Sequence, residues 1–235
     1  MTATWMELCL DVHDPGAADP ERADRFAAMA SFWARATGLR LDAGNGPDDP
    51  GDLGGLDGEP GADIALCPVP EPKTVKHRVH LDVRTADVDD LVAAGGTVLE
   101  RLPGWTVLAD PDGGELCAFV RDRADLPDYR VYEVVVDSTD PAMIARWWAD
   151  RFGAKADTDE NPWWWVEGVP GMPFDCLVFT PVPEPKTVKN RLHWDVRGDV
   201  EEFLAAGATR LWEMPRWTVL ADPEGNEFCV FPAVG

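Results

Sequence analysis

The run "PVPEPKTVKHRVHLDVR" (Pro68–Arg84) decides the fold, because the chain writes it a second time as "PVPEPKTVKNRLHWDVR" (Pro181–Arg197). The two runs are identical at 14 of 17 positions. Each begins as a loop rich in proline and lysine and then alternates apolar with polar residues, which is typical of a half-buried strand. Each strand carries a histidine at the same point, His80 or His193. The chain therefore contains one loop-and-strand segment twice.

A second match extends the repeat. The run "WTVLADPDGGELC" (Trp105–Cys117) recurs as "WTVLADPEGNEFC" (Trp217–Cys229), with ten of 13 positions identical. The two matches are offset by 113 and 112 residues, which is too long for a solenoid repeat and indicates a duplicated domain. We expect copy one at residues 1–122 and copy two at residues 130–235. The charged, proline-containing residues 123–129 are then a linker.

Length and composition narrow the classes of protein. The chain has 235 residues, of which 45% are apolar, so it suits one large domain or two of ordinary size. A formal charge of −22 would repel a phosphate backbone, which argues against a nucleic-acid partner. The sequence has neither a run of 18 apolar residues nor a signal-peptide pattern, so we expect no membrane partner. Five cysteines without a CxxC pair indicate reduced thiols and a cytoplasmic location.

The order of elements is the same in both copies. Residues 5–12 alternate as a strand, and the pattern then predicts a helix from Asp19 as N-cap to Gly38. The counterpart helix in copy two begins at Asp140 and ends at Gly153. Short strands lead to the repeated run, and a short helix and further strands follow it. Each copy is therefore predicted to contain two βαβββ units.

This order, with "DPDGG" and "DPEGN" turns before the last strand of each copy, resembles the vicinal oxygen chelate superfamily. That group includes glyoxalase I, extradiol dioxygenases and bleomycin-resistance proteins. The runs "VPEPKTVKNRLHWDVR" and "WTVLADPEGNEFCV" are most similar to a glyoxalase-like subgroup of actinobacteria. The resemblance covers nearly the whole chain. It implies an α+β fold of two tandem modules, each a pair of βαβββ units forming a cup-shaped mixed sheet with helices outside. It also implies that the two modules pair within one chain, which can then be a monomer.

Alternation in the repeated strand places His80 and Asp82 opposite Val79, Leu81 and Val83. By itself, the polar face of such a strand is most often simply solvated. The resemblance instead places this face inside a cup. We therefore expect both histidines to face a solvent-accessible cup.

Superfamily enzymes bind a divalent metal through matching positions on the first and last strand of each unit. Carried over copy by copy, these positions are Glu7, Ala65, His80 and Cys117 in copy one, and Glu133, Val178, His193 and Cys229 in copy two. Glu, His and Cys together are able to form a three-ligand zinc site. Alanine and valine coordinate nothing, however, and a thiolate suits hard metals poorly. The sequence therefore predicts no cofactor, or at most a loosely held divalent metal.

Copy two contains an aromatic segment that copy one lacks. The stretch "DENPWWWVEGVPGMPFDC" (Asp159–Cys176) should send Trp163 and Trp165 to one face of a strand and Trp164 to the other. These tryptophans are either a stacking wall for a flat ligand or packing against a helix or the other copy. Copy one has a Gly/Asp/Pro-rich loop or ragged hairpin at residues 42–63 instead. We expect the main ligand pocket to involve the aromatic segment.

The lysines and arginine of the repeated loop, Lys73, Lys76 and Arg78, either steer an anionic ligand or pair with acidic neighbours. We expect the pairing. Likewise, each cysteine that ends a repeated motif is either a nucleophile beside its histidine or a buried apolar residue, and we expect the second.

Two classes of function remain open. The first is a binder of a planar or apolar small molecule, of the resistance or sequestration kind. Its ligand-binding candidates are Trp163, Trp165, His193, Glu133, His80 and Glu7. The second is an enzyme, such as a lyase, isomerase or dioxygenase, that uses Glu7 with His80 or Glu133 with His193. Its catalytic candidates are Glu7, His80, Cys117, Glu133, His193 and Cys229.

Overall fold

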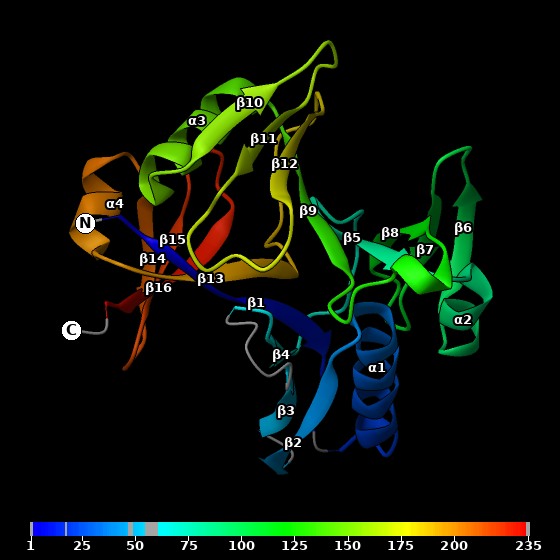
Figure 1. The fold of residues 1–235 in the computed structure, drawn as a ribbon. Coiled ribbons are helices and arrows are strands. Elements are labelled where there is room, and N and C mark those ends of the chain that lie inside the picture. Colours follow the sequence, from blue (N-terminus) through cyan, green and yellow to red (C-terminus); the bar gives the residue numbers. More distant parts are fainter. Residues whose placement is uncertain (1, 17, 47–48, 55–60, 234–235) are drawn as a thin grey trace.

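Two eight-stranded mixed β-sheets make up the computed structural model, which describes residues 2–16, 18–46, 49–54 and 61–233 (Figure 1). Sheet A consists, in spatial order, of β14 (Thr209–Glu213), β15 (Thr218–Ala221), β16 (Glu227–Pro232), β13 (Leu192–Gly198), β1 (Thr4–His13), β4 (Ile64–Val69), β3 (Asp49–Gly54) and β2 (Arg40–Gly46). Sheet B consists of β10 (Lys155–Thr158), β11 (Trp164–Glu167), β12 (Cys176–Pro181), β9 (Val131–Ser138), β5 (Val79–Thr85), β8 (Glu115–Val120), β7 (Thr106–Ala109) and β6 (Thr97–Arg101). The predicted α+β class, with each sheet built from a pair of βαβββ units, is confirmed.

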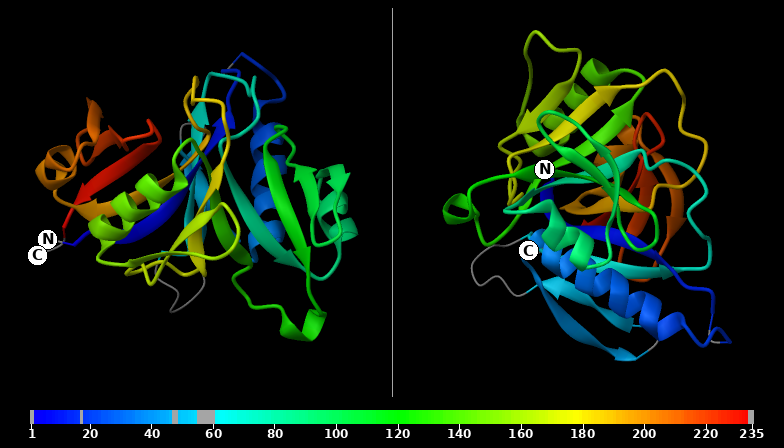
Figure 2. Two further views of the ribbon diagram at one scale, coloured as in Figure 1. Left: turned by 90° about the horizontal axis from the view of Figure 1, so that it is seen from above. Right: turned by 90° about the vertical axis from the view of Figure 1, so that its right-hand side faces the viewer.

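The helices of the described residues lie outside these sheets (Figures 1 and 2). They are α1 (Arg22–Thr37), α2 (Val88–Ala93), α3 (Pro141–Phe152), α4 (Val200–Ala205) and a 3₁₀ turn, η1 (Arg123–Asp125). No helix of the described chain is long and apolar enough to span a membrane.

The sheets divide the chain differently from the sequence copies. Sheet B is the continuous middle of the chain, whereas sheet A is built from its two ends, coloured blue to cyan and orange to red in Figure 1. Strand β1 of copy one pairs antiparallel with β13 of copy two, and β5 of copy one pairs antiparallel with β9 of copy two. Each sheet therefore joins one βαβββ unit from each copy. The linker at residues 123–129 stays a prediction, because the sheets do not mark where one sequence copy ends and the other begins.

The repeated run is where the chain passes from one sheet to the other. Residues 70–78 lead from β4 in sheet A to β5 in sheet B, and residues 182–191 lead from β12 in sheet B to β13 in sheet A. We call these two segments the crossovers. Their near-identity follows from this shared task, because each must leave one sheet and enter the other at matching points.

Each crossover is held by an acidic residue of the other copy. The Nζ of Lys76 donates to Oδ2 of Asp137 at 2.7 Å. In the mirrored position, the Nζ of Lys189 donates to Oδ2 of Asp11. Backbone bonds of 2.7 Å reinforce both joins, because the amides of Asp11 and Asp137 each donate to an arginine carbonyl in the opposite crossover. These reciprocal contacts fix the two copies against each other.

Each crossover is also tied to the last strand of its own copy. Lys73 Nζ donates to Glu115 at 2.8 Å, and Lys186 Nζ donates to Glu227 at 2.6 Å. The predicted pairing with acidic neighbours is thereby confirmed for Lys73 and Lys76, whereas Arg78 donates to the backbone carbonyl of Asp137 at 3.4 Å.

Buried tryptophans link the helices to the repeated turns. The indole Nε1 of Trp33 donates to Oδ2 of Asp110 at 3.1 Å, and Trp148 donates in the same way to Asp222 at 3.2 Å. Burial raises the pKa of both carboxyls to about 6. The large apolar side chains on the other face of the repeated strands, such as Trp194, are fully buried beneath the helices.

Most predicted element ends agree with the structure. Helix α3 has Asp140 as its N-cap and Gly153 as its left-handed C-cap, as predicted. The predicted start of the first helix is wrong, because α1 begins at Arg22. The side chain of Asp19 accepts a hydrogen bond from the amide of Glu21, so it closes a turn before the helix and does not cap it. Strands β2 and β3 form a hairpin with an irregular register, and residues 47–48 and 55–60 lie outside the described residues.

Candidate functional site

A cavity of about 710 Å³ lies on the concave face of sheet B. We call it the aromatic cavity, because its walls are lined by Trp105, Phe119, Tyr132, Trp163 and Trp165. The last three come from copy two and the first two from copy one, so the cavity exists only because the two copies share the sheet.

One wall is a packed aromatic ladder. The ring of Trp105 stacks on Phe119 with centroids 5.9 Å apart, and Phe119 meets the edge of Tyr132 at 5.4 Å. The guanidinium of Arg84 lies 4.5 Å above the Tyr132 ring and is held by Asp175 at 2.7 Å. These contacts fix the orientation of the rings before any ligand enters.

A second part of the cavity lining comes from the aromatic segment. Trp163 and Trp165 line the cavity, and Trp163 is 38% exposed. Trp164 points to the other face, where the guanidinium of Arg146 in α3 lies 4.5 Å above its ring. Strand alternation therefore divides the three tryptophans as predicted: two line the cavity and one packs on a helix.

Polar side chains gather at the floor of the aromatic cavity. His80, Asp82 and Cys117 bring one donor atom each within 4.8 Å of one another, and His80 Nε2 lies 3.4 Å from Asp82 Oδ1. Glu133 is the direct strand partner of Asp82 across β5 and β9. The floor therefore collects two carboxyls, an imidazole and a thiol.

Burial changes the acidity of this floor. It raises the pKa of Glu133 to about 7, and the nearby Asp82 carboxylate adds to the effect. The thiol of Cys176 donates to Glu133 Oε1 at 3.5 Å. Burial and Asp82 also raise the pKa of the Cys117 thiol. Glu133 can thus exchange a proton near neutral pH, whereas Cys117 stays protonated and is a poor nucleophile.

The concave face of sheet A carries the same residue types. Glu7 is the direct strand partner of Asp195, and His193, Asp195 and Cys229 form a second cluster with donor atoms within 4.8 Å of one another. The Cys229 Sγ lies 3.6 Å from His193 Nε2. Burial raises the pKa of both Glu7 and Asp195 to about 7.

Two predictions about these residues are wrong. Glu7 does not meet His80, and Glu133 does not meet His193, because the βαβββ units combine across copies. Glu7 instead shares sheet A with His193, and Glu133 shares sheet B with His80.

The second error concerns exposure. His80 lines the aromatic cavity as predicted, but His193 is only 7% exposed. The reason is that Cys9 lies directly across from it on β1 and Cys229 packs against its ring. Burial, with a contribution from Lys189, lowers the pKa of His193 to about 3, so it is neutral.

The donor atoms of His80, Asp82 and Cys117 determine which metals fit the floor of the aromatic cavity. Imidazole, carboxylate and thiol are ligands that Zn²⁺ accepts. Oδ1 of Asp82 is buried, and its neighbours His80 Nε2, at 3.4 Å, and the Cys117 thiol are themselves the other potential ligands. The fourth position carried over from the family holds Val178, however, and a valine side chain offers no ligand atom. A metal would also have to remove the proton of Cys117, whose pKa is raised. The residues fit a thiophilic ion with three protein ligands, and they do not fit a hard, oxygen-preferring one.

Asp82 and Asp195 were absent from the candidate ligands predicted from the sequence. Their signal is the H-x-D spacing in both repeated strands, which places histidine and aspartate on one face of the strand.

Comparison with known proteins identifies the fold. A family model described as a glyoxalase-like domain matches residues 8–119 and again residues 133–231. Glyoxalase I from Zea mays is similar in structure, with a TM-score of 0.67 at 15% identity, covering 98% of this chain and 92% of that one. A putative dioxygenase from Bacillus subtilis gives 0.61 at 15% identity, covering 99% and 86%. No curated protein matches the sequence. At these identities, the structural likeness concerns the fold alone.

Proposed function

The chain belongs to the glyoxalase-like domain family, and from that premise we propose that it binds a planar or apolar small molecule in the aromatic cavity. The function is of the resistance or sequestration kind, in which the ligand is held and not converted. The observation that carries the proposal is the set of five aromatic side chains that line a cavity of about 710 Å³. Ligand pockets of this kind typically have volumes of roughly 300–1,000 Å³.

The walls provide the affinity. Burying an aromatic face against a ligand contributes roughly 1–3 kcal/mol at about 25 cal/mol per Å² of apolar surface. Two or three such faces support binding on the order of micromolar after the cost of association. The Trp105–Phe119 stack and the Arg84–Tyr132 contact hold their rings in place, so little ordering is needed on binding.

The chemistry of the floor favours binding over catalysis. Cys117 remains a thiol, and the apolar Val178 replaces a potential metal ligand. We propose that any divalent ion is loosely held by His80, Asp82 and Cys117 and that the binder requires no cofactor. Ligand contacts then come chiefly from Trp163, Trp165 and the floor residues.

A second function has one observation in its favour. The carboxyl of Glu133, with a pKa of about 7, lies on the cavity floor across from Asp82 and accepts or releases a proton at neutral pH. A lyase or isomerase acting on a carbon acid would use such a group as its base, and His80 is available to orient the substrate. In sheet A, Glu7 and His193 share a strand pair but His193 is buried, so we place the reaction in sheet B.

We also propose that the protein acts as a monomer in a cytoplasm that keeps its thiols reduced. Both sheets are already completed by pairing between the copies, so no second chain is needed to form a cup. We propose an actinobacterial source, because the repeated motifs are similar to those of a glyoxalase-like subgroup of actinobacteria.

The test uses tryptophan variants and planar probes. We expect 2-naphthol or acridine to bind the wild-type protein in calorimetric titration, and Trp163→Ala or Trp165→Ala to weaken binding roughly 5- to 100-fold. The matched control is Trp217→Ala, since Trp217 stacks on Phe231 in sheet A with centroids 5.4 Å apart, as Trp105 stacks in sheet B. Equal affinity in all three variants would place the ligand elsewhere. Conversion of a bound compound by wild type but not by Glu133→Gln would establish the enzyme instead.

A further inference from the structure

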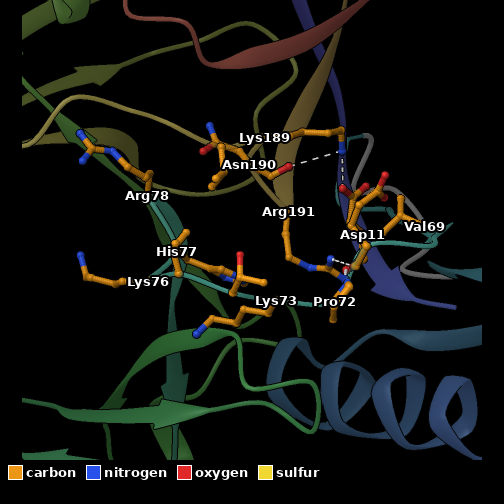
Figure 3. A pocket seen from close by; sticks show the side chains of 14 residues that line it. Asp11, Val69, Pro72, Lys73, Lys76, His77, Arg78, Lys189, Asn190 and Arg191 are labelled. Atoms are coloured by element: carbon orange, nitrogen blue, oxygen red, sulfur yellow. Dashed lines mark hydrogen bonds and ion pairs between the residues drawn. The ribbon is translucent and has the colours of Figure 1, made fainter. Parts of the chain in front are cut away.

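A second cavity, of about 380 Å³, lies between the two crossovers. We call it the crossover pocket. Residues 71–78 form one side and residues 188–191 the other, with Asp11 and Val69 at the sheet A end. Figure 3 shows the side chains of the two crossovers lying across from one another. It shares no lining residue with the aromatic cavity.

The crossover pocket is cationic on an acidic protein. Its lining includes Lys73, Lys76, Arg78, Lys189 and Arg191. Only two carboxylates, those of Asp11 and Glu71, line it. The whole chain has the opposite balance, with 21 basic residues against 43 acidic ones. The lysines are paired with carboxylates, as described above, so the free positive charge must come from the arginines.

Arg191 is a buried arginine of the pocket whose ion pair with a carboxylate is long. Its side chain is 10% exposed, and its guanidinium donates to the backbone carbonyls of Glu71 and Asp11. Carbonyl oxygens accept hydrogen bonds but carry no net charge. The only carboxylate within 4 Å in the described chain is Asp112, at 3.8 Å, and its Oδ2 also accepts from the amide of His13 at 2.8 Å, so the charge of Arg191 is only partly compensated. A buried arginine in this position attracts an anion.

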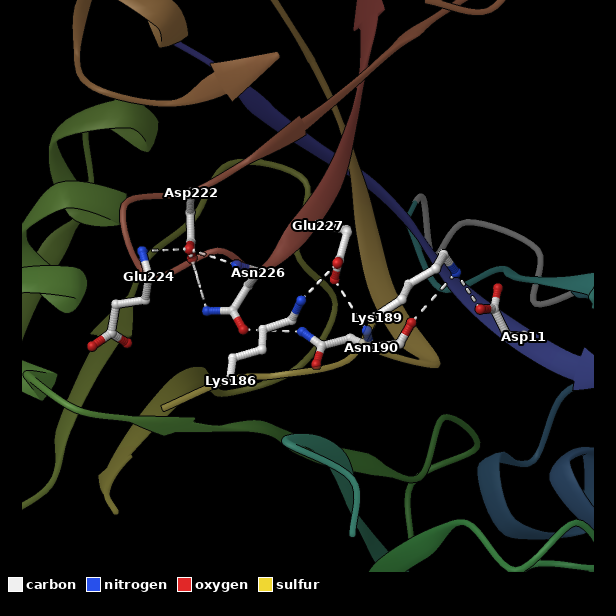
Figure 4. Close-up of polar contacts among 8 residues, drawn as sticks. All are labelled: Asp11, Lys186, Lys189, Asn190, Asp222, Glu224, Asn226 and Glu227. Carbon is white, nitrogen blue, oxygen red and sulfur yellow. Dashed lines mark hydrogen bonds and ion pairs between the residues drawn. The ribbon is translucent and has the colours of Figure 1, made fainter. Parts of the chain in front are cut away.

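The two copies differ at one pair of positions beside the pocket. In copy two, Asn190 Nδ2 donates to Asn226 Oδ1 at 3.0 Å, and Asn226 in turn donates to Asp222 (Figure 4). The residue in the place of Asn190 in copy one is His77, and Gly114 replaces Asn226. A Cβ on Gly114 would lie 2.7 Å from the His77 ring and 2.7 Å from Oδ2 of Asp110, so the imidazole occupies part of the space of the missing side chain.

This exchange leaves a hydrogen-bonding atom without a partner. His77 lines the crossover pocket with a side chain 10% exposed, and its Nε2 is buried with no hydrogen bond. Its Nδ1 lies 4.0 Å from Glu115, beyond hydrogen-bond distance, so the proton of the neutral ring is free to sit on Nε2. A buried polar group of this kind costs stability unless something binds it. Copy two has Asn190 at this position, so the fold does not require a histidine there.

We propose that the crossover pocket binds the carboxylate of a small organic acid. Arg191 supplies the charge, His77 Nε2–H donates to a carboxylate oxygen, and Pro72, Val75 and Val188 contact an apolar body. A single charge with an apolar tail suits the lining better than a phosphate, whose second charge would face Asp11 and Glu71. This site goes beyond the proposed function, because it needs none of the residues of the aromatic cavity.

The experiment compares hexanoate with uncharged hexanamide by calorimetric titration of the full chain, with inorganic phosphate as a third probe. We expect hexanoate to bind and both other probes to bind at least about tenfold more weakly, since charge-assisted bonds contribute about that factor. The decisive variant is His77→Asn with Gly114→Asn, which copies the bonded pair of copy two. It should lower hexanoate affinity roughly tenfold while the melting temperature stays the same or rises.

Trp165→Ala is the matched control, and we expect it to leave hexanoate binding unchanged. Loss of binding in Trp165→Ala would place hexanoate in the aromatic cavity and overturn the proposal. Three other results would also overturn the proposal. They are full hexanoate affinity in the His77→Asn, Gly114→Asn protein, equal affinity for hexanamide or phosphate, and no hexanoate binding at all. Failure of planar probes to bind the aromatic cavity would count only against the proposed function.

Discussion

Replacing Glu133 by glutamine should change how stability depends on pH. Burial raises the pKa of Glu133 from 4.5 to about 7 in the folded protein. Between these values the folded state holds a proton that the unfolded state has released. The free energy of unfolding therefore falls as the pH rises through this window, and the loss is complete above about pH 7. Glutamine has no proton to lose and should remove this part of the pH dependence.

The size of the effect follows from the gap between the two pKa values. A shift from 4.5 to about 7 corresponds to roughly 3 kcal/mol at about 1.4 kcal/mol per pH unit. Because Glu133 lines an open cavity, screening by water reduces this to about 2 kcal/mol. The free energy of unfolding of the wild-type protein should fall by more than this between pH 5 and pH 8, because Glu7 and Asp195 in sheet A also have pKa values of about 7.

Urea unfolding at pH 5 and pH 8, followed by tryptophan fluorescence, measures the difference. We expect the fall in unfolding free energy between these pH values to be about 2 kcal/mol smaller in Glu133→Gln than in wild type. Glu167→Gln is the matched control, because Glu167 lines the same cavity but pairs with Lys155 at 3.3 Å. A fall of the same size in Glu133→Gln and wild type would refute the assigned protonation of the cavity floor.

Three further predictions test other parts of the structure. Trp148→Phe should destabilise the protein by about 1–3 kcal/mol in urea unfolding, because it leaves the buried Oδ2 of Asp222 without its indole donor; an unchanged midpoint would contradict this. Cys117 and Cys229 should react with iodoacetamide at pH 8 far more slowly in the folded than in the unfolded protein, as mass spectrometry would show, because burial raises their thiol pKa values. Elemental analysis after dialysis against a chelator should find well under one equivalent of metal, and a full equivalent would show that Val178 does not weaken the site.

Much of the fold could be predicted from the sequence because the signals are local. The Asp140 cap, the Gly153 stop and the buried faces of the repeated strands depend on residues a few positions apart. The partner of β1 could not be predicted, because its two possible partners, β5 and β13, have nearly the same sequence, "VHLDVR" and "LHWDVR". Which of them β1 meets is decided by contacts far apart in the chain, such as that of Lys189 with Asp11.

The candidate site, like the fold, could be predicted only where the signal is local in the sequence. Alternation alone placed Trp163 and Trp165 on one face, and the family resemblance placed His80 toward a cup. The burial of His193 depends on Cys9 across the strand pair, which the sequence copy containing His193 does not include. The grouping of Glu133 with His80 likewise required knowledge of which units share a sheet.

The exchange of units between the sheets changes how the two cups are able to diverge. In a symmetric homodimer of single modules, every substitution enters both sites at once, so the sites remain identical. In this chain each position occurs once, and the first half of copy two shapes only sheet B while its second half shapes only sheet A. One cup can therefore gain a tryptophan wall while the other buries its histidine. The crossovers alone must serve both sheets, and the runs that contain them still agree at 14 of 17 positions.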